Sequence, residues 1–71
     1  MAVVYKFNFG ERSVILEIPS FQTGIIQEEI DYLRKKEMKA KRKEENHIPE
    51  EVRILLQNMQ KKHERLVIKT N

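Results

Sequence analysis

Apolar and polar residues alternate along the start of the chain, on both sides of a glycine. Residues 3–18 read VVYKFNFGERSVILEI, with Gly10 near the centre. A period of two residues is typical of a β-strand with one buried face, and glycine suits the first position of a two-residue type II′ turn. The pattern therefore predicts a β-hairpin over residues 3–18.

The two-residue loop also fixes which residues of the hairpin face each other. Counting outward from the loop places Phe7 opposite Val14 and Tyr5 opposite Leu16. A slip by one residue would turn the apolar set toward solvent, and a hairpin alone is only marginally stable in water. We therefore expect the rest of the chain to cover one face, which holds six apolar residues: Val3, Tyr5, Phe7, Val14, Leu16 and Ile18.

Apolar residues recur at helical spacing after a short link. Ile26, Ile30 and Leu33 stand at i, i+4 and i+7, a stripe that can lie on the hairpin. Thr23 is a suitable N-cap for this helix. We expect a helix over residues 24–43, whose charged last part is a basic extension, either a solvated helix or a frayed arm.

A second amphipathic segment follows a polar break at residues 44–47. Pro49 suits the first turn of a helix, because the N–H that it lacks would be unpaired there. The apolar residues that follow share or border one helical face, which predicts an amphipathic helix over residues 49–66. Residues 66–70 are either a short third strand or the last turn of that helix, and their β-branched composition favours the strand.

Length and composition limit what these elements can build. A chain of 71 residues forms a single small domain and buries only about 60% of the surface that its unfolded form exposes. With 39% hydrophobic and 35% charged residues the core is thin, so support from a partner or a homodimer fits the composition. We expect one α+β domain over residues 1–71, an N-terminal β-hairpin packed on two helices, with a short C-terminal third strand if residues 66–70 are extended.

Several functional classes lack their sequence signatures. No apolar run approaches the length of a membrane span, and the N-terminus has neither the basic region nor the apolar stretch of a signal peptide. We therefore expect an intracellular protein, cytoplasmic or, in a eukaryote, nuclear. The chain has no cysteine, which excludes a disulfide framework and a thiol nucleophile.

Catalytic and metal-binding patterns are also missing. His47 and His63 are sixteen residues apart, so no two histidines occupy adjacent helical turns as a zinc site on one helix requires. The two glycines form no phosphate-binding loop, and neither Ser13 nor Ser20 stands in a nucleophile elbow. We expect a non-catalytic protein with no metal and no cofactor.

Positive charge is concentrated in one short segment. Residues 34–43, RKKEMKAKRK, carry seven basic residues and the single acid Glu37, a net charge of +6 in a chain whose total is +3. Such segregation is typical of a surface that binds an anionic partner. The basic residues are Arg34, Lys35, Lys36, Lys39, Lys41, Arg42 and Lys43.

Helix electrostatics explains part of this segment. Acidic residues begin each expected helix and basic residues end it, which is the order that the helix dipole favours. Asp31 with Lys35 and Glu37 with Lys41 also form favourable i, i+4 pairs. These effects account for one or two bases at a helix end, not for seven. Three interpretations remain open: a solvated helix, a nucleic-acid site, or a site for an acidic protein, a lipid headgroup or an import receptor.

Two functional hypotheses follow, from different classes. In the first, the chain is a small accessory protein whose seven basic residues contact the phosphates of DNA or RNA, with little reading of base sequence. In the alternative, it is a protein-interaction or regulatory module. Its second helix then binds a partner or a second copy through four apolar residues: Val52, Leu55, Leu56 and Met59.

Overall fold

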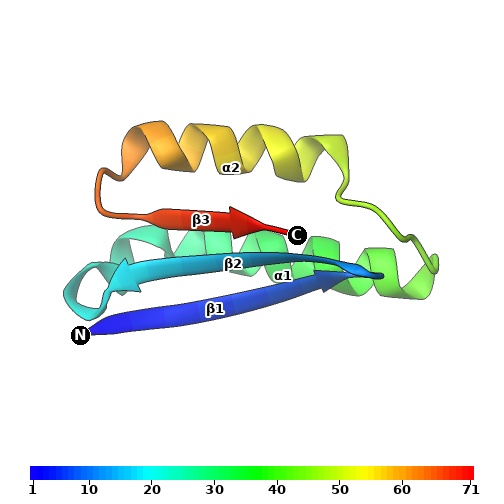
Figure 1. Cartoon of the computed structure of the whole chain (residues 1–71), viewed down its shortest axis with the longest axis horizontal. Coiled ribbons are helices and arrows are strands. Elements are labelled where there is room, and N and C mark those ends of the chain that lie inside the picture. The colour runs from blue at the N-terminus through cyan, green and yellow to red at the C-terminus, as the bar shows by residue number, and fades with distance from the viewer.

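Three strands form one sheet, and two helices cover one of its faces (Figure 1). The computed structural model describes all residues of the chain, 1–71. The elements are, in chain order, β1 (Ala2–Phe9), β2 (Arg12–Pro19), the 3₁₀ helix η1 (Ser20–Ile26), α1 (Gln27–Arg42), α2 (Glu50–Lys62) and β3 (Val67–Thr70). The hairpin, the two helices and the short third strand confirm the α+β fold expected from the sequence.

The order of strands in the sheet follows the order in the chain. β1 pairs with β2 and β2 with β3, both antiparallel, so β1 and β3 are the two edges. The chain leaves β2, passes through both helices and returns as β3, with α1 behind the sheet and α2 on the side of β3 (Figure 1). The hairpin tip and the end of α1 consequently lie at the same end of the molecule.

The hairpin has the predicted register. Phe7 pairs with Val14, and Tyr5 pairs with Leu16. Gly10 adopts φ +68°, the left-handed backbone that a type II′ turn requires at its first central position. The alternation of apolar residues and the choice of turn residue therefore agree, and both were readable from the sequence.

Side chains from both layers meet in one apolar core that contains no polar side chain. Val3 and Tyr5, assigned to the same face, are only half-buried, whereas Phe7 and Phe9 farther along β1 are fully buried. The core consists of fourteen residues: Phe7, Phe9, Val14, Leu16, Ile18, Ile26, Ile30, Leu33, Ala40, Ile48, Val52, Leu56, Met59 and Leu66.

The first helix begins later than its sequence pattern indicated. Residues 20–26 form a 3₁₀ helix, in which Thr23 Oγ1 donates a hydrogen bond to the Ser20 carbonyl at 3.0 Å. Thr23 is therefore not the N-cap of α1, which starts at Gln27. The tighter 3₁₀ turn carries the chain from the end of β2 into the helical layer. From there α1 stays helical to Arg42, which settles the question of a frayed arm in favour of a helix.

The second helix ends earlier than expected, at Lys62 rather than near residue 66. His63 has an extended backbone, and the Gln60 side chain donates a hydrogen bond to the Leu66 carbonyl at 2.8 Å across the turn back to the sheet. Leu66 still lies in the core, just before β3 begins. Leu66 is therefore apolar because it packs into the core where the chain returns to the sheet, and not because it belongs to the apolar face of α2. Neither helix has the length and apolarity needed to cross a membrane.

Candidate nucleic-acid interface

The basic segment occupies the second half of α1, beside the tip of the hairpin and the loop of residues 43–49 (Figure 1). The seven cations do not share one environment. Arg34 and Lys36 contact other parts of the chain, and Lys41 lines a hollow together with three carboxylates. The other four are exposed and have no ion-pair partner. This division decides which of them can contact a ligand.

Arg34 is used within the fold. Its Nη1 donates a hydrogen bond to the Lys6 carbonyl at 3.0 Å and lies 3.1 Å from Glu37 Oε1. Its guanidinium carbon lies 4.3 Å from the centre of the Phe7 ring, a cation–π contact. Arg34 therefore fastens α1 to the edge strand β1, and a phosphate could bind it only in competition with these contacts.

Lys36 is also engaged, with the second helix. Its Nζ lies 2.8 Å from Glu51 Oε1 and 5.3 Å from the centre of the Tyr32 ring. The hydrogen bond with Glu51 raises the pKa of Lys36 above its ordinary value, and the same bond lowers the pKa of Glu51. Both groups thus stay charged at neutral pH, and the pair joins α1 to α2.

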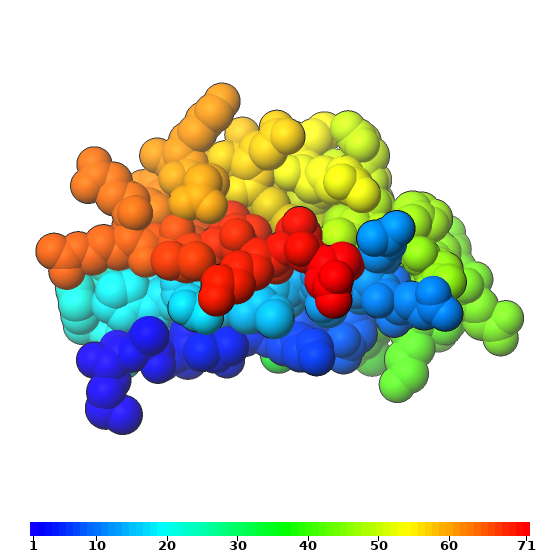
Figure 2. Space-filling view, viewed as in Figure 1, coloured from blue at the N-terminus to red at the C-terminus, as the bar shows by residue number.

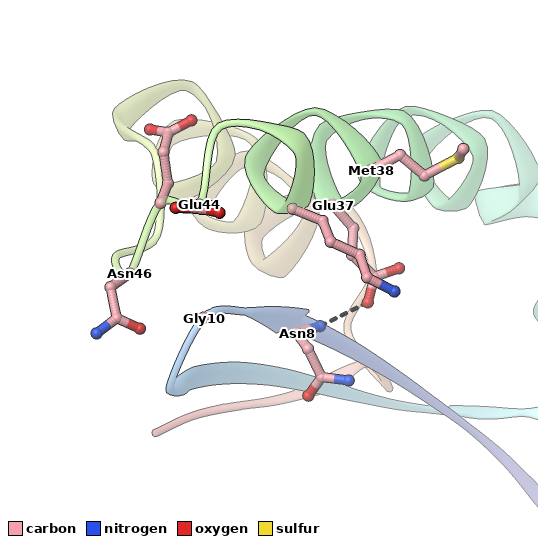
Figure 3. Close-up of a pocket in the computed structure, with 8 residues that line it drawn as sticks. Asn8, Gly10, Glu37, Met38, Glu44 and Asn46 are labelled. Carbon is pink, nitrogen blue, oxygen red and sulfur yellow. Dashed lines mark hydrogen bonds between the residues drawn. The ribbon is translucent and has the colours of Figure 1, made fainter.

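Lys41 is one of the residues that line a hollow between α1 and the hairpin tip. Figure 3 shows this hollow. Three carboxylates, those of Glu37, Glu44 and Glu45, line the same hollow. In Figure 3 the Asn8 backbone N–H donates to the Glu37 carboxylate across its floor, at 2.6 Å. A phosphate entering here would meet more negative than positive charge, so Lys41 is a poor phosphate contact.

Four cations remain: Lys35, Lys39, Arg42 and Lys43. All are exposed, and none has a hydrogen bond or an ion pair from its side chain. At about 100° per residue, Lys35, Lys39 and Arg42 fall within an arc of about 60° on one side of α1. Lys43 follows the last helical residue and lines the same hollow as Lys39. The four therefore form a basic cluster on one side of the helix end.

Acidic groups border this cluster on the side of α2. Glu50 and Glu51, at the start of α2, and Glu45 line the hollow that Lys39 and Lys43 share. A phosphate chain would therefore approach from the outer side of α1, away from α2. Lys35 and Arg42 line neither of these hollows, and the acid nearest to them on their side of α1 is Asp31, one helical turn before Lys35.

Most of the apolar residues proposed as a partner surface are buried, whereas that hypothesis needs them at the surface. Val52, Leu56 and Met59 are at most 6% exposed and belong to the core of the chain itself. Leu55 is half-buried at the surface, next to Ile54, which is 50% exposed. With the fold intact, a partner can reach only Leu55 of the four. The buried face of α2 is therefore centred on Leu56 rather than on Leu55.

The two histidines lie in separate places. His63 Nε2 is 3.3 Å from Glu29 Oε1, and this little-exposed pair connects the end of α2 to the start of α1. His47 is exposed, with its Nε2 3.4 Å from Glu45 Oε2. No three side chains among His, Cys, Asp and Glu lie together in a way that could hold a metal ion.

Sequence reasoning missed the roles of Glu37 and Asn46. In the sequence Glu37 is the single acidic residue of the basic segment, but in the structure its carboxylate accepts a hydrogen bond from the backbone of β1. Asn46 looked like part of a polar break, yet its side-chain oxygen accepts the Glu11 backbone N–H at the hairpin tip. Both contacts join residues about thirty positions apart, so no local pattern signals them. Comparison of the chain with protein-family models, with curated proteins and with solved structures gave no match.

Proposed function

We propose that the chain is a non-catalytic nucleic-acid-binding protein that contacts the phosphates of DNA or RNA through Lys35, Lys39, Arg42 and Lys43. The observation that carries this proposal is that these four exposed cations lie together at one end of α1 with no ion-pair partner. Lysine and arginine side chains that contact phosphates position a protein on a nucleic acid without reading its sequence. Binding is therefore expected to be weak and nearly independent of sequence.

The number of available cations sets the expected salt dependence. If each of the four neutralises one phosphate, the slope of log K against log salt is about −3.6 on duplex DNA and about −2.8 on a single strand. These values are upper limits, because the acids on the side of α2 oppose the approach of a phosphate. Non-specific dissociation constants near physiological salt are on the order of micromolar or weaker.

Fluorescence anisotropy with labelled single-stranded and duplex DNA, and with RNA, at three salt concentrations tests the proposal. The test variant carries Lys35→Gln, Lys39→Gln, Arg42→Gln and Lys43→Gln. Glutamine is a comparable helix former, and all four sites are exposed, so the fold should persist. We expect the variant to lose most of the salt-dependent affinity while its circular dichroism spectrum stays that of the wild type.

A control of equal charge separates this cluster from net charge. Lys6, Lys61, Lys62 and Arg65 are exposed and have no ion-pair partner, and they lie outside the cluster. Replacing these four by Gln removes the same charge and should leave the salt slope nearly unchanged. An equal loss in both variants would mean that only net charge matters. Absence of binding by the wild type at low salt would refute the proposal and leave a protein partner as the alternative.

A further inference from the structure

The strand β1 is a sheet edge, with β2 on one side and no strand on the other (Figures 1 and 2, blue). In an antiparallel strand, successive residues direct their N–H and C=O groups alternately toward the partner and away from it. Phe9 and Phe7 bond β2, so the groups of Asn8, Lys6 and Val4 point outward. Such a row of unpaired groups is a template for pairing with another strand, which natural proteins usually block.

Two side chains of α1 occupy part of this row. Arg34 Nη1 donates to the Lys6 carbonyl at 3.0 Å, and Glu37 Oε2 accepts the Asn8 N–H at 2.6 Å. The two side chains are joined by their own ion pair at 3.1 Å, through the second carboxylate oxygen of Glu37. A neighbouring parallel strand would bond the same two backbone groups, one on each side of Phe7. The ion pair thus takes the place of one residue of such a strand.

The geometry holds this arrangement in place. The Arg34 guanidinium lies on the Phe7 ring, whose side chain is fully buried, at 4.3 Å. The Glu37 side chain is only 19% exposed. An incoming strand would have to displace both side chains before it could bond the Lys6 carbonyl or the Asn8 N–H. The outward groups that the cap leaves free are those of Ala2 and Val4, the Lys6 N–H and the Asn8 carbonyl.

We propose that Arg34 and Glu37 form a cap on the edge of β1 that prevents this strand from pairing with a second copy of the chain. A second copy is the occupant because a C₂ contact between two β1 edges needs no surface other than the one each copy already has. This role is independent of nucleic-acid binding, since Arg34 is not in the basic cluster. The cap explains why two charges of the basic segment face the sheet.

Removal of the cap should convert the chain from a monomer to a self-associating species. The variants are Glu37→Ala and Arg34→Ala in the full chain, followed by size-exclusion chromatography with light scattering over a concentration series. We expect the mass of each variant to rise with concentration toward twice the wild-type value, whereas the wild type stays monomeric. Hydrogen exchange at Asn8 should become faster in dilute Glu37→Ala, because its N–H loses its acceptor.

Matched controls keep this test specific to β1. Lys35→Ala and Glu44→Ala remove one charge each from neighbouring positions whose side chains have no hydrogen bond to β1, and both should stay monomeric. Adding Lys6→Pro to Glu37→Ala should restore the monomer. Lys6 directs its N–H outward, and proline is tolerated on edge strands at such positions.

A folding defect would be recognised by circular dichroism. In that case Glu37→Gln, which keeps one acceptor for the Asn8 N–H but loses the charge that holds Arg34, should show an intermediate tendency to associate. The proposal is overturned if the folded variants stay monomeric at every concentration. It is also overturned if Glu37→Ala associates equally well with Lys6→Pro present. Neither result would bear on the salt slope of the basic cluster, so the two proposals fail separately.

Discussion

Gly10 is the position at which a single methyl group should disturb the fold most. Its φ of +68° disfavours any residue with a side chain. A Cβ at this position would also lie 2.6 Å from Asn46 Cα and 2.7 Å from the Glu45 carbonyl oxygen, both backbone atoms of the loop that follows α1. Because no flexible side chain can simply rotate away from these contacts, the backbone of the hairpin tip or of the loop must shift.

The cost of Gly10→Ala follows from these two terms. A left-handed conformation costs a residue with a Cβ roughly 1–2 kcal/mol, and forcing extra atoms into a packed site costs roughly 1–3 kcal/mol. Loss of backbone freedom in the unfolded chain returns about 0.4–1 kcal/mol. The net destabilisation is therefore about 1–5 kcal/mol, a large share of the stability of a small domain. For a domain of this size it corresponds to a fall in melting temperature of at least about 4 °C.

The chain supplies its own control for this measurement. Gly24 is the only other glycine, and a Cβ there would meet nothing within 4 Å. Gly24→Ala should leave the melting temperature unchanged or raise it slightly, since alanine restricts the unfolded chain. Thermal melts followed by circular dichroism compare the two variants directly. Equal melting temperatures for Gly10→Ala and Gly24→Ala would refute both the turn assignment and the close approach of residues 45–46 to the hairpin tip.

Two further predictions concern α2. Leu56→Ala should cost about 2–5 kcal/mol in the free energy of unfolding, whereas Leu55→Ala should cost clearly less, because Leu56 is 6% exposed and Leu55 is half-buried. Urea denaturation of both variants checks this order, and the reverse order would mean that the helix is rotated. The lowered pKa of Glu51 means that its ion pair stabilises the fold above the ordinary pKa of 4.5 and that this contribution is lost as pH falls through the folded-state pKa. The melting temperature of wild type should therefore exceed that of Glu51→Gln at pH 7, with the difference shrinking toward pH 3, and a constant difference would contradict the assignment.

The elements of the fold were readable from local patterns because each has a clear period. The hairpin register followed from one turn and an alternating stripe, and the stripe of Ile26, Ile30 and Leu33 proved fully or nearly buried. The ends of the helices were less predictable. η1 replaces the first turn of the expected helix, and Leu66 returned to the core from a turn rather than from α2. Where the chain crosses between layers, tertiary packing rather than helical period decides the backbone.

The candidate site was harder to predict than the fold, because the sequence does not show which way each charged side chain points. A run of seven bases gives no sign that Arg34 faces the sheet or that Lys36 faces α2. Those directions depend on how the two helices are rotated against the sheet and against each other. The helical period does group Lys35, Lys39 and Arg42, but only the structure shows which side of α1 is turned to solvent.

The fold also lowers the net charge that a ligand would meet at the end of α1. Taken alone, residues 34–43 carry a net charge of +6, but residues 34–51 contain five acids against the same seven bases. The chain reverses after α1, so that Glu45, Glu50 and Glu51 lie beside the bases rather than far from them. Net charge at this end of the molecule is therefore small, and any affinity for phosphates must come from the side of α1 that faces away from those acids. For this reason a comparison of two variants with equal net charge and different charged sites can decide the function, whereas a change in net charge alone cannot.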